Sequence, residues 1–133
     1  MKVVLDTGVM VSALVNARGS SAKTLSLILD GDIKILYDNR ILFEYIEVLS
    51  TNDFGFNIEK INDTIHFVRY EGTFVEADSL DVIFHDEPNK KFYEVYISGE
   101  AQYLITGNRE HFPEDSAVII PGDFLKIYEK HKS

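Results

Sequence analysis

The sequence predicts an α/β fold, a three-layer α/β/α sandwich with a mainly parallel central sheet. Short apolar runs typical of buried strands alternate along the chain with segments whose apolar residues follow helical spacing. This alternation favours parallel strands joined by helical crossovers that cover both faces of the sheet. With 133 residues, 45% of them hydrophobic, the chain has the size and composition of one domain, and we expect a single domain over residues 1–133.

The predicted strands are short runs rich in Val, Ile, Leu, Phe and Tyr. They lie at residues 3–5, 33–37, 73–75, 82–84, 103–106 and 118–120. In an open parallel sheet, ligands bind beside the carboxyl ends of the strands. The polar residues that directly follow these runs are therefore the first candidates for a functional site, and they are Asp6, Asp86 and Asn108.

The predicted helices begin near Val9, Ser20, Asn39, Ile58, Pro88 and Pro121. Their expected N-caps include Ser20 or Ser21, Asp38 and Asn57, and Gly99 is an expected terminator. Two apolar faces are expected, one from Ala22, Leu25, Ile28 and Leu29 and the other from Ile58, Ile61, Ile65 and Val68.

Charge and cysteine content exclude several classes of function. There are 22 Asp and Glu residues against 13 Lys and Arg, a net charge of −9, so binding of nucleic acid by bulk attraction is disfavoured. A nucleic-acid substrate would be held locally, and a basic partner protein would suit this surface better. The absence of cysteine leaves oxygen and imidazole as metal ligands. No membrane span or signal peptide is visible, so we expect a soluble, cytoplasmic protein.

Several acids follow an order that suits a divalent cation. Glu44 lies in an apolar helical stripe, three residues after Ile41 and four before Val48, where a carboxylate is costly unless it is paired. A salt bridge, or a position at the edge of the stripe, would explain Glu44 alone, and helix capping would explain Asp6, Asp86 and Glu87 one by one. Together they offer oxygen ligands from separate segments, which is what a hard cation needs.

Four stretches resemble the PIN-domain nucleases, and in particular the branch that includes toxin components of toxin–antitoxin systems. The stretches are VVLDTGVMVSAL, ILFEYIEVL, HDEPNKKFYEVYISGEAQYLITGNREHFP and IIPGDFL. The resemblance implies a PIN-like fold and an endoribonuclease dependent on Mg²⁺ or Mn²⁺, with RNA as substrate, a homodimer, and an antitoxin protein as a partner. It makes Asp6 and Glu44 the first two metal-site acids and takes the third from residues 86–89.

The turn at residues 86–89 departs from the pattern of that branch. Asn89 stands where the branch usually carries Asp, and Pro88 replaces another frequent acid. An amide still offers a carbonyl oxygen, but the lost charge weakens divalent-ion binding. We therefore expect Asp86 as the third ligand, with Glu87 or Asn89 as alternatives. Asn108, where PIN domains at large carry Asp, is the fourth expected catalytic residue.

Short polar and basic residues near these acids would handle the substrate. Thr7, Thr106 and Asn108 would position water or phosphate. Lys90, Lys91, Arg109 and His111 are candidates to anchor the RNA backbone, although turn chemistry and ordinary solvated surface explain these residues about as well.

Three other functions compete with the nuclease. Asp6-Thr7-Gly8 is similar to the Asp-Thr-Gly of aspartic proteases, but those enzymes are all-β, and here Val9 begins a helix. A phosphoacceptor receiver domain would need a Lys after a late strand, where this chain has Thr106-Gly107-Asn108. The main rival is a catalytically weakened PIN domain that acts as an RNA- or protein-binding module, which the neutral Asn89 supports.

Overall fold

Five parallel strands form one sheet in the computed structural model, which describes residues 1–51, 55–80 and 87–132. The strands are β1 (Lys2–Leu5), β2 (Lys34–Tyr37), β3 (Thr73–Phe74), β4 (Tyr103–Ile105) and β5 (Val118–Ile119). Their order in the sheet is β3-β2-β1-β4-β5, and every neighbouring pair is parallel. The strand predicted at residues 82–84 lies outside the described residues.

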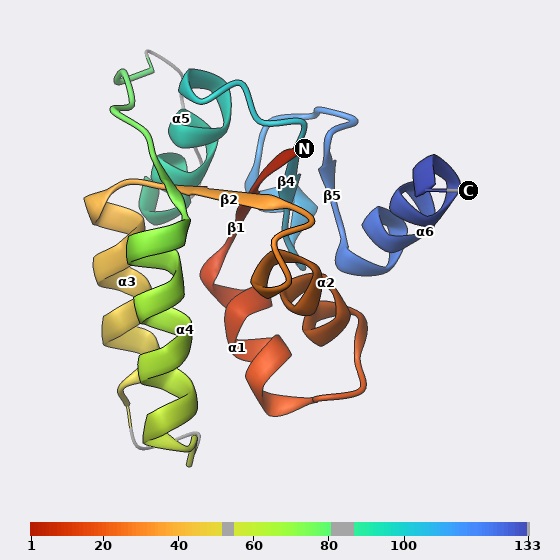
Figure 1. Ribbon diagram of the computed structural model, residues 1–133. Coiled ribbons are helices and arrows are strands. Elements are labelled where there is room, and N and C mark those ends of the chain that lie inside the picture. Colours follow the sequence, from red (N-terminus) through yellow and green to blue (C-terminus); the bar gives the residue numbers. More distant parts are fainter. Residues whose placement is uncertain (52–54, 81–86, 133) are drawn as a thin grey trace.

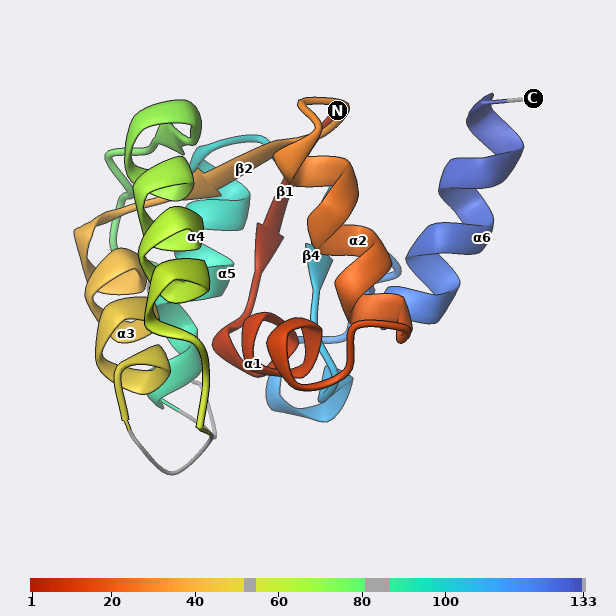
Figure 2. The same cartoon turned by 60° about the horizontal axis from the view of Figure 1, so that its bottom comes forward.

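Six α-helices in the described part of the chain surround this sheet. They are α1 (Thr7–Val15), α2 (Ser20–Leu29), α3 (Asn39–Leu49), α4 (Ile58–Glu71), α5 (Lys90–Ser98) and α6 (Pro121–Lys132). Helix α5 packs on β1, β2 and β4, whereas α1 and α2 lie on the opposite side of the sheet and α2 contacts α6 (Figures 1 and 2). The predicted α/β/α sandwich with a parallel sheet is confirmed. None of the described helices has the length and apolar character needed to cross a membrane.

Two of the predicted helix caps are confirmed and one is wrong. Asp38 accepts a hydrogen bond from Ile41 N at 3.0 Å, and Asn57 accepts one from Glu59 N at 2.8 Å. Helix α2 begins at Ser20, so neither Ser20 nor Ser21 is its cap, and Gly19 is the N-cap, without a side-chain hydrogen bond. The reason is the preceding turn, in which Gly19 N donates to Asn16 O at 3.1 Å and places Ser20 inside the helix.

The start of α5 also differs from the prediction. Pro88 lies in a short 3₁₀ turn, η2 (Glu87–Asn89), and the α-helix begins after it at Lys90. A 3₁₀ turn is frequent at the N-terminus of an α-helix. Gly99 ends the helix as predicted.

The two predicted apolar faces are buried or partly buried except at their outer residues. Leu29 is the last residue of α2 and Ile58 the first of α4, and they are 41% and 71% exposed. Terminal residues project beyond the surface on which a helix packs, so helical spacing alone overestimates their burial. Further inside the helices, Ile28 and Val68 are buried.

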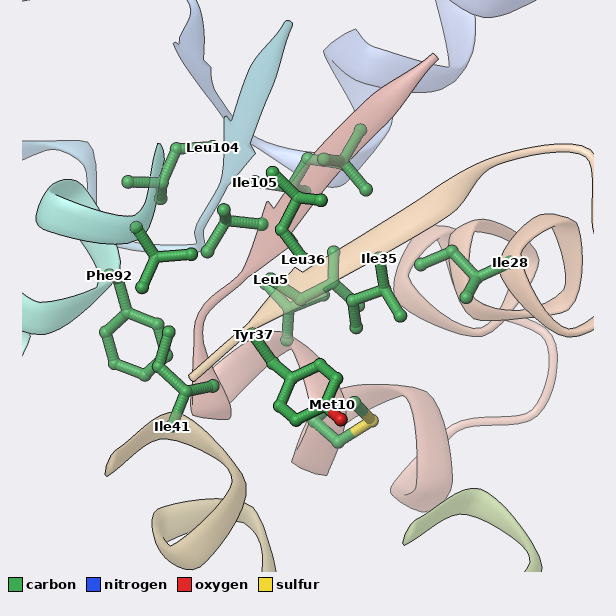
Figure 3. Packing of buried hydrophobic residues seen from close by; sticks show 14 of the residues in the cluster. Leu5, Met10, Ile28, Ile35, Leu36, Tyr37, Ile41, Phe92, Leu104 and Ile105 are labelled. Carbon is green, nitrogen blue, oxygen red and sulfur yellow. The ribbon is translucent and has the colours of Figure 1, made fainter. Parts of the chain in front are cut away.

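The core lies between the sheet and both helical layers. Figure 3 shows Leu5 and Leu36 of the sheet among Ile41 of α3, Phe92 of α5 and Met10 of α1. Val3, Val4 and Leu5 of β1 are fully buried, which is why that strand reads as a continuous apolar run.

The strand order places a switch point between β1 and β4. The chain moves from β1 to β2 on one side and later returns to β4 on the other side. The crevice at the carboxyl ends of two such strands is the usual ligand site of an open parallel sheet. Here the residues that follow these strands are Asp6 and Thr106.

Candidate metal-binding active site

Asp6 lies at the carboxyl end of β1 and is 7% exposed. Its Oδ1 accepts a hydrogen bond from Val9 N at 2.9 Å and so caps α1, while its Oδ2 accepts the hydroxyl hydrogen of Thr106. Burial raises the pKa of the Asp6 carboxyl, and the negative charge of Glu44 adds to the rise, although the two hydrogen bonds and nearby His111 oppose it. A cation at this position would favour the charged form.

Parallel pairing brings Thr106 to Asp6. Leu5 of β1 is in register with Ile105 of β4, and Asp6 N donates to Ile105 O at 3.1 Å. The residues that follow the two strands are consequently neighbours, 100 positions apart in sequence. The Thr106 hydroxyl is fully buried, and it also accepts a hydrogen bond from Asn108 N at 3.0 Å. It therefore has a fixed direction toward Asp6.

Glu44 reaches the same edge of the sheet from the middle of α3. Its Oε2 accepts the hydroxyl hydrogen of Thr7, the residue after Asp6, and its Oε1 forms a 2.7 Å ion pair with Lys91 Nζ on α5. The side chain is 29% exposed, so Glu44 lies at the edge of the apolar stripe, as one of its two structural explanations expects. The salt bridge offered as the structural alternative for Glu44 is present, and it lies within the candidate site.

Tyr45 fixes α3 against the end of β1. Its ring is fully buried, and its hydroxyl donates to Leu5 O at 2.5 Å. Burial raises the pKa of this phenol well above its usual value, and the charges of Asp6, Glu44 and Asp38 add to the rise. Tyr45 thus stays neutral and keeps its donor. Sequence patterns gave Tyr45 no role of its own, although its position directly after Glu44 was a usable signal.

Of the site residues predicted in the second half of the chain, only some lie close to Asp6 and Glu44. Asn89 Nδ2 lies 3.4 Å from His111 Nδ1, and the charge of His111 acts on Asp6. Arg109, by contrast, is exposed and lines a separate cleft of about 230 Å³ next to Phe112. Arg109 is thus not gathered with the acids.

A second charged cluster, which the sequence analysis missed, joins α3 to α5 beside the acids. Arg40 forms ion pairs of 2.7 Å with Asp38 and with Glu94, and Glu94 is only 3% exposed. The second Glu94 oxygen accepts a hydrogen bond from Leu80 N at 2.8 Å. Burial works against ionisation, but the hydrogen bonds from Arg40 and Leu80 N leave the pKa of Glu94 below its usual value.

Two clefts open beside Glu44, and both contain Arg40 and Lys91. One, of about 330 Å³, is completed by Ser79, Glu87, Pro88, Lys90 and Glu94. The other, of about 510 Å³, is completed by Phe43, Glu44, Glu47 and Val48. Three basic side chains therefore border the candidate site in spite of the acidic composition of the chain.

The carboxylate ligands of the candidate site are of the type that a divalent cation prefers. Fewer than three of them come together in the described part of the chain. Asp6 and Glu44 supply two carboxylates from separate elements, near enough for the charge of Glu44 to raise the pKa of Asp6. Among residues 1–51, 55–80 and 87–132, no group of three or more His, Asp or Glu side chains is placed to hold a metal. The expected third ligand, Asp86, lies outside those ranges, and Glu87 is exposed.

Comparison with known families agrees with this architecture. The family model of the PIN domain matches residues 2–110, which include β1, α3, α5 and β4. No curated protein matches the chain. PIN domains are generally nucleases, and typically use divalent metal ions. Because the family match spans most of the sequence, this chain belongs to the PIN domain family.

Proposed function

We propose that this protein is an endoribonuclease dependent on Mg²⁺ or Mn²⁺. The observation that carries the proposal is the convergence of Asp6 and Glu44 at the switch point of the sheet, each held by the hydroxyl of a threonine. A bound divalent ion supplies an activated water and neutralises charge on the attacked phosphate. Asp6 and Glu44 would hold the ion together with Asp86 or, as alternatives, Glu87 or Asn89.

The protein's own residues would orient these ligands and the substrate. The hydroxyls of Thr7 and Thr106 fix the two carboxylates in direction. Asn108, whose backbone N–H bonds to Thr106, would present its amide to water or phosphate. Lys90 and Arg40 line a cleft beside Glu44 and would hold the RNA backbone by charge.

The direct test is cleavage of single-stranded RNA with Mn²⁺ or Mg²⁺, compared with the metal-chelated protein. Asp6→Asn and Glu44→Gln should each reduce cleavage by at least about 100-fold, because loss of a residue that merely supports a metal ligand already costs roughly 10- to 100-fold. Asp63→Asn is the matched control, since Asp63 is an exposed acid on α4 that lines neither cleft beside Glu44, and it should keep its activity.

The alternative is a binding module without catalysis, and calorimetry distinguishes the two. Mn²⁺ affinity that Asp6→Asn abolishes supports the enzyme. If the unaltered protein shows no Mn²⁺ affinity at millimolar concentration, the weakened PIN domain becomes the better description.

A cellular role as the cytoplasmic toxin of a toxin–antitoxin system belongs to the same proposal. Its support is the likeness of the four quoted stretches to that branch and the acidic composition, which suits a basic antitoxin. A homodimer is expected on the same ground. Growth arrest on expression of the protein, absent in Glu44→Gln, is the outcome that this role requires.

A further inference from the structure

Lys91 occupies a position in the site that a solvated surface lysine would not have. Its ammonium lies 2.7 Å from Glu44 Oε1, donates to Pro88 O and lies 5.1 Å from the centre of the Phe92 ring. The side chain is only 14% exposed, less than that of Glu44. Three contacts and partial burial therefore hold one positive charge against a candidate metal ligand.

The other acidic oxygens of the site are partnered by neutral groups. Glu44 Oε2 has the Thr7 hydroxyl, and the Asp6 oxygens have the Thr106 hydroxyl and Val9 N. Neutral donors can remain while a carboxylate also binds an ion, because a carboxylate oxygen has two lone pairs. A positive charge at 2.7 Å differs, since it repels any second cation at the same oxygen.

We propose that Lys91 is the resident counter-cation of Glu44, and that a divalent ion binds Glu44 only by displacing the Lys91 ammonium from Oε1. This inference rests on the proposed metal-dependent function. A lysine suits the role because its compact charge sits on a flexible stem that can move. The displaced ammonium would remain in the cleft that it shares with Arg40 and Lys90, where it can meet an RNA phosphate.

The test is Mn²⁺ affinity by calorimetry in the absence of RNA, so that cleavage does not enter the readout. Lys91→Met and Lys91→Gln remove the charge and should bind Mn²⁺ roughly five- to tenfold more tightly than the unaltered protein. Lys91→Arg keeps the charge and should show no such gain. Lys90→Met is the matched control, because it removes one charge from the adjacent residue, whose charge acts on Glu94. Circular dichroism checks that each variant folds, and two neutral variants keep the test open if one does not.

The outcomes separate this inference from the proposed function. A gain in both neutral Lys91 variants, absent in Lys91→Arg and Lys90→Met, supports the displacement. An equal gain in Mn²⁺ affinity in Lys90→Met would mean that the gain comes from the lower positive charge in general, and it would overturn the displacement of Lys91. Unchanged or weaker affinity in the Lys91 variants, with Mn²⁺ still bound by the unaltered protein, overturns the inference and leaves the nuclease proposal standing. Absence of binding in all proteins overturns both.

Discussion

At the scale of single residues, Asp6 caps helix α1 and is also a proposed metal ligand, and the two roles are compatible. One carboxylate oxygen receives Val9 N and starts α1, while the other faces Thr106 across the switch point. The burial that raises the pKa of Asp6 makes its negative charge costly in the metal-free protein. The cap therefore supports the geometry of the site, and a cation would offset the cost of the charge.

Tyr45 offers the sharpest test of how a single hydrogen bond supports this site. The change Tyr45→Phe removes the hydroxyl that donates to Leu5 O, inside a fully buried environment. We expect a loss of about 1–2 kcal/mol in the free energy of unfolding, the usual effect of removing a buried hydrogen bond. Urea unfolding followed by circular dichroism measures it.

Tyr70→Phe is the control for Tyr45→Phe, since it removes the same hydroxyl from a residue that is 65% exposed. Its unfolding free energy should stay within about 0.5 kcal/mol of the unaltered protein. Equal stability of Tyr45→Phe and Tyr70→Phe would mean that the Tyr45 hydroxyl does not anchor α3 to β1.

At the scale of elements, the site depends on the packing of α3 and α5, which carry Glu44 and Lys91. Arg40 on α3 bonds to Glu94 on α5, and Glu94 also receives Leu80 N from the segment that precedes η2. Because Glu94 is nearly fully buried, its charge depends on these partners. This cluster fixes the distance between the two helices, and so that between Glu44 and Lys91.

The Glu94 cluster predicts a stability change that depends on pH. The folded protein keeps Glu94 ionised to a lower pH than the unfolded chain does, because its pKa is lowered in the fold. Its contribution is therefore full above about pH 4.5, the ordinary value, and is lost as the pH falls through the folded pKa. Glu94→Gln should destabilise the protein by about 1–2 kcal/mol at pH 7, since half-exposed Arg40 can rehydrate.

Urea unfolding at pH 7 and at pH 4 measures this effect. The difference in unfolding free energy between Glu94→Gln and the unaltered protein should be smaller at pH 4 than at pH 7. Glu47→Gln, which changes an exposed acid on α3, should behave like the unaltered protein at both values. If Glu94→Gln instead loses more unfolding free energy at pH 4 than at pH 7, ionised Glu94 does not stabilise the fold in the way proposed.

Local sequence patterns predicted most elements, and their errors have local causes. The bounds of α3 follow from Asp38 as cap and the buried Ile41, Leu42, Tyr45 and Leu49, and both signals lie within the helix itself. The N-cap of α2 was misplaced because the turn that ends at Gly19 is closed by a backbone hydrogen bond from Gly19 N to Asn16 O, which residue type does not encode strongly. Exposure at helix ends depends on tertiary packing, so Leu29 and Ile58 were assigned to buried faces.

At the scale of the whole molecule, topology decided which candidate residues meet. Asp6 and Thr106 were predictable neighbours, since each directly follows a strand of one parallel sheet. Two other contacts could not be predicted, because contacts between side chains on two helices depend on how those helices pack. They are the pairs Lys91–Glu44 and Arg40–Glu94. Lys91 was consequently expected to anchor RNA, whereas its immediate partner is a site acid.

The charge of the whole molecule leads to a prediction about RNA binding. A net charge of −9 repels RNA in general, so the proposed RNA substrate would be attracted locally, by Arg40, Lys90 and Lys91 in the cleft beside the acids. For single strands, each phosphate contact changes the log–log dependence of affinity on salt by about 0.7. In Glu44→Gln, in which cleavage should be strongly reduced, RNA affinity should fall with salt. Adding Lys90→Met should reduce the slope of log affinity against log salt concentration by about 0.7.

Fluorescence anisotropy with labelled RNA from low to moderate salt gives both slopes. Lys34→Met removes an exposed lysine at the amino end of β2, the opposite edge of the sheet, and should leave the slope unchanged. If Lys34→Met lowers the slope as much as Lys90→Met does, RNA is not held at the proposed clefts.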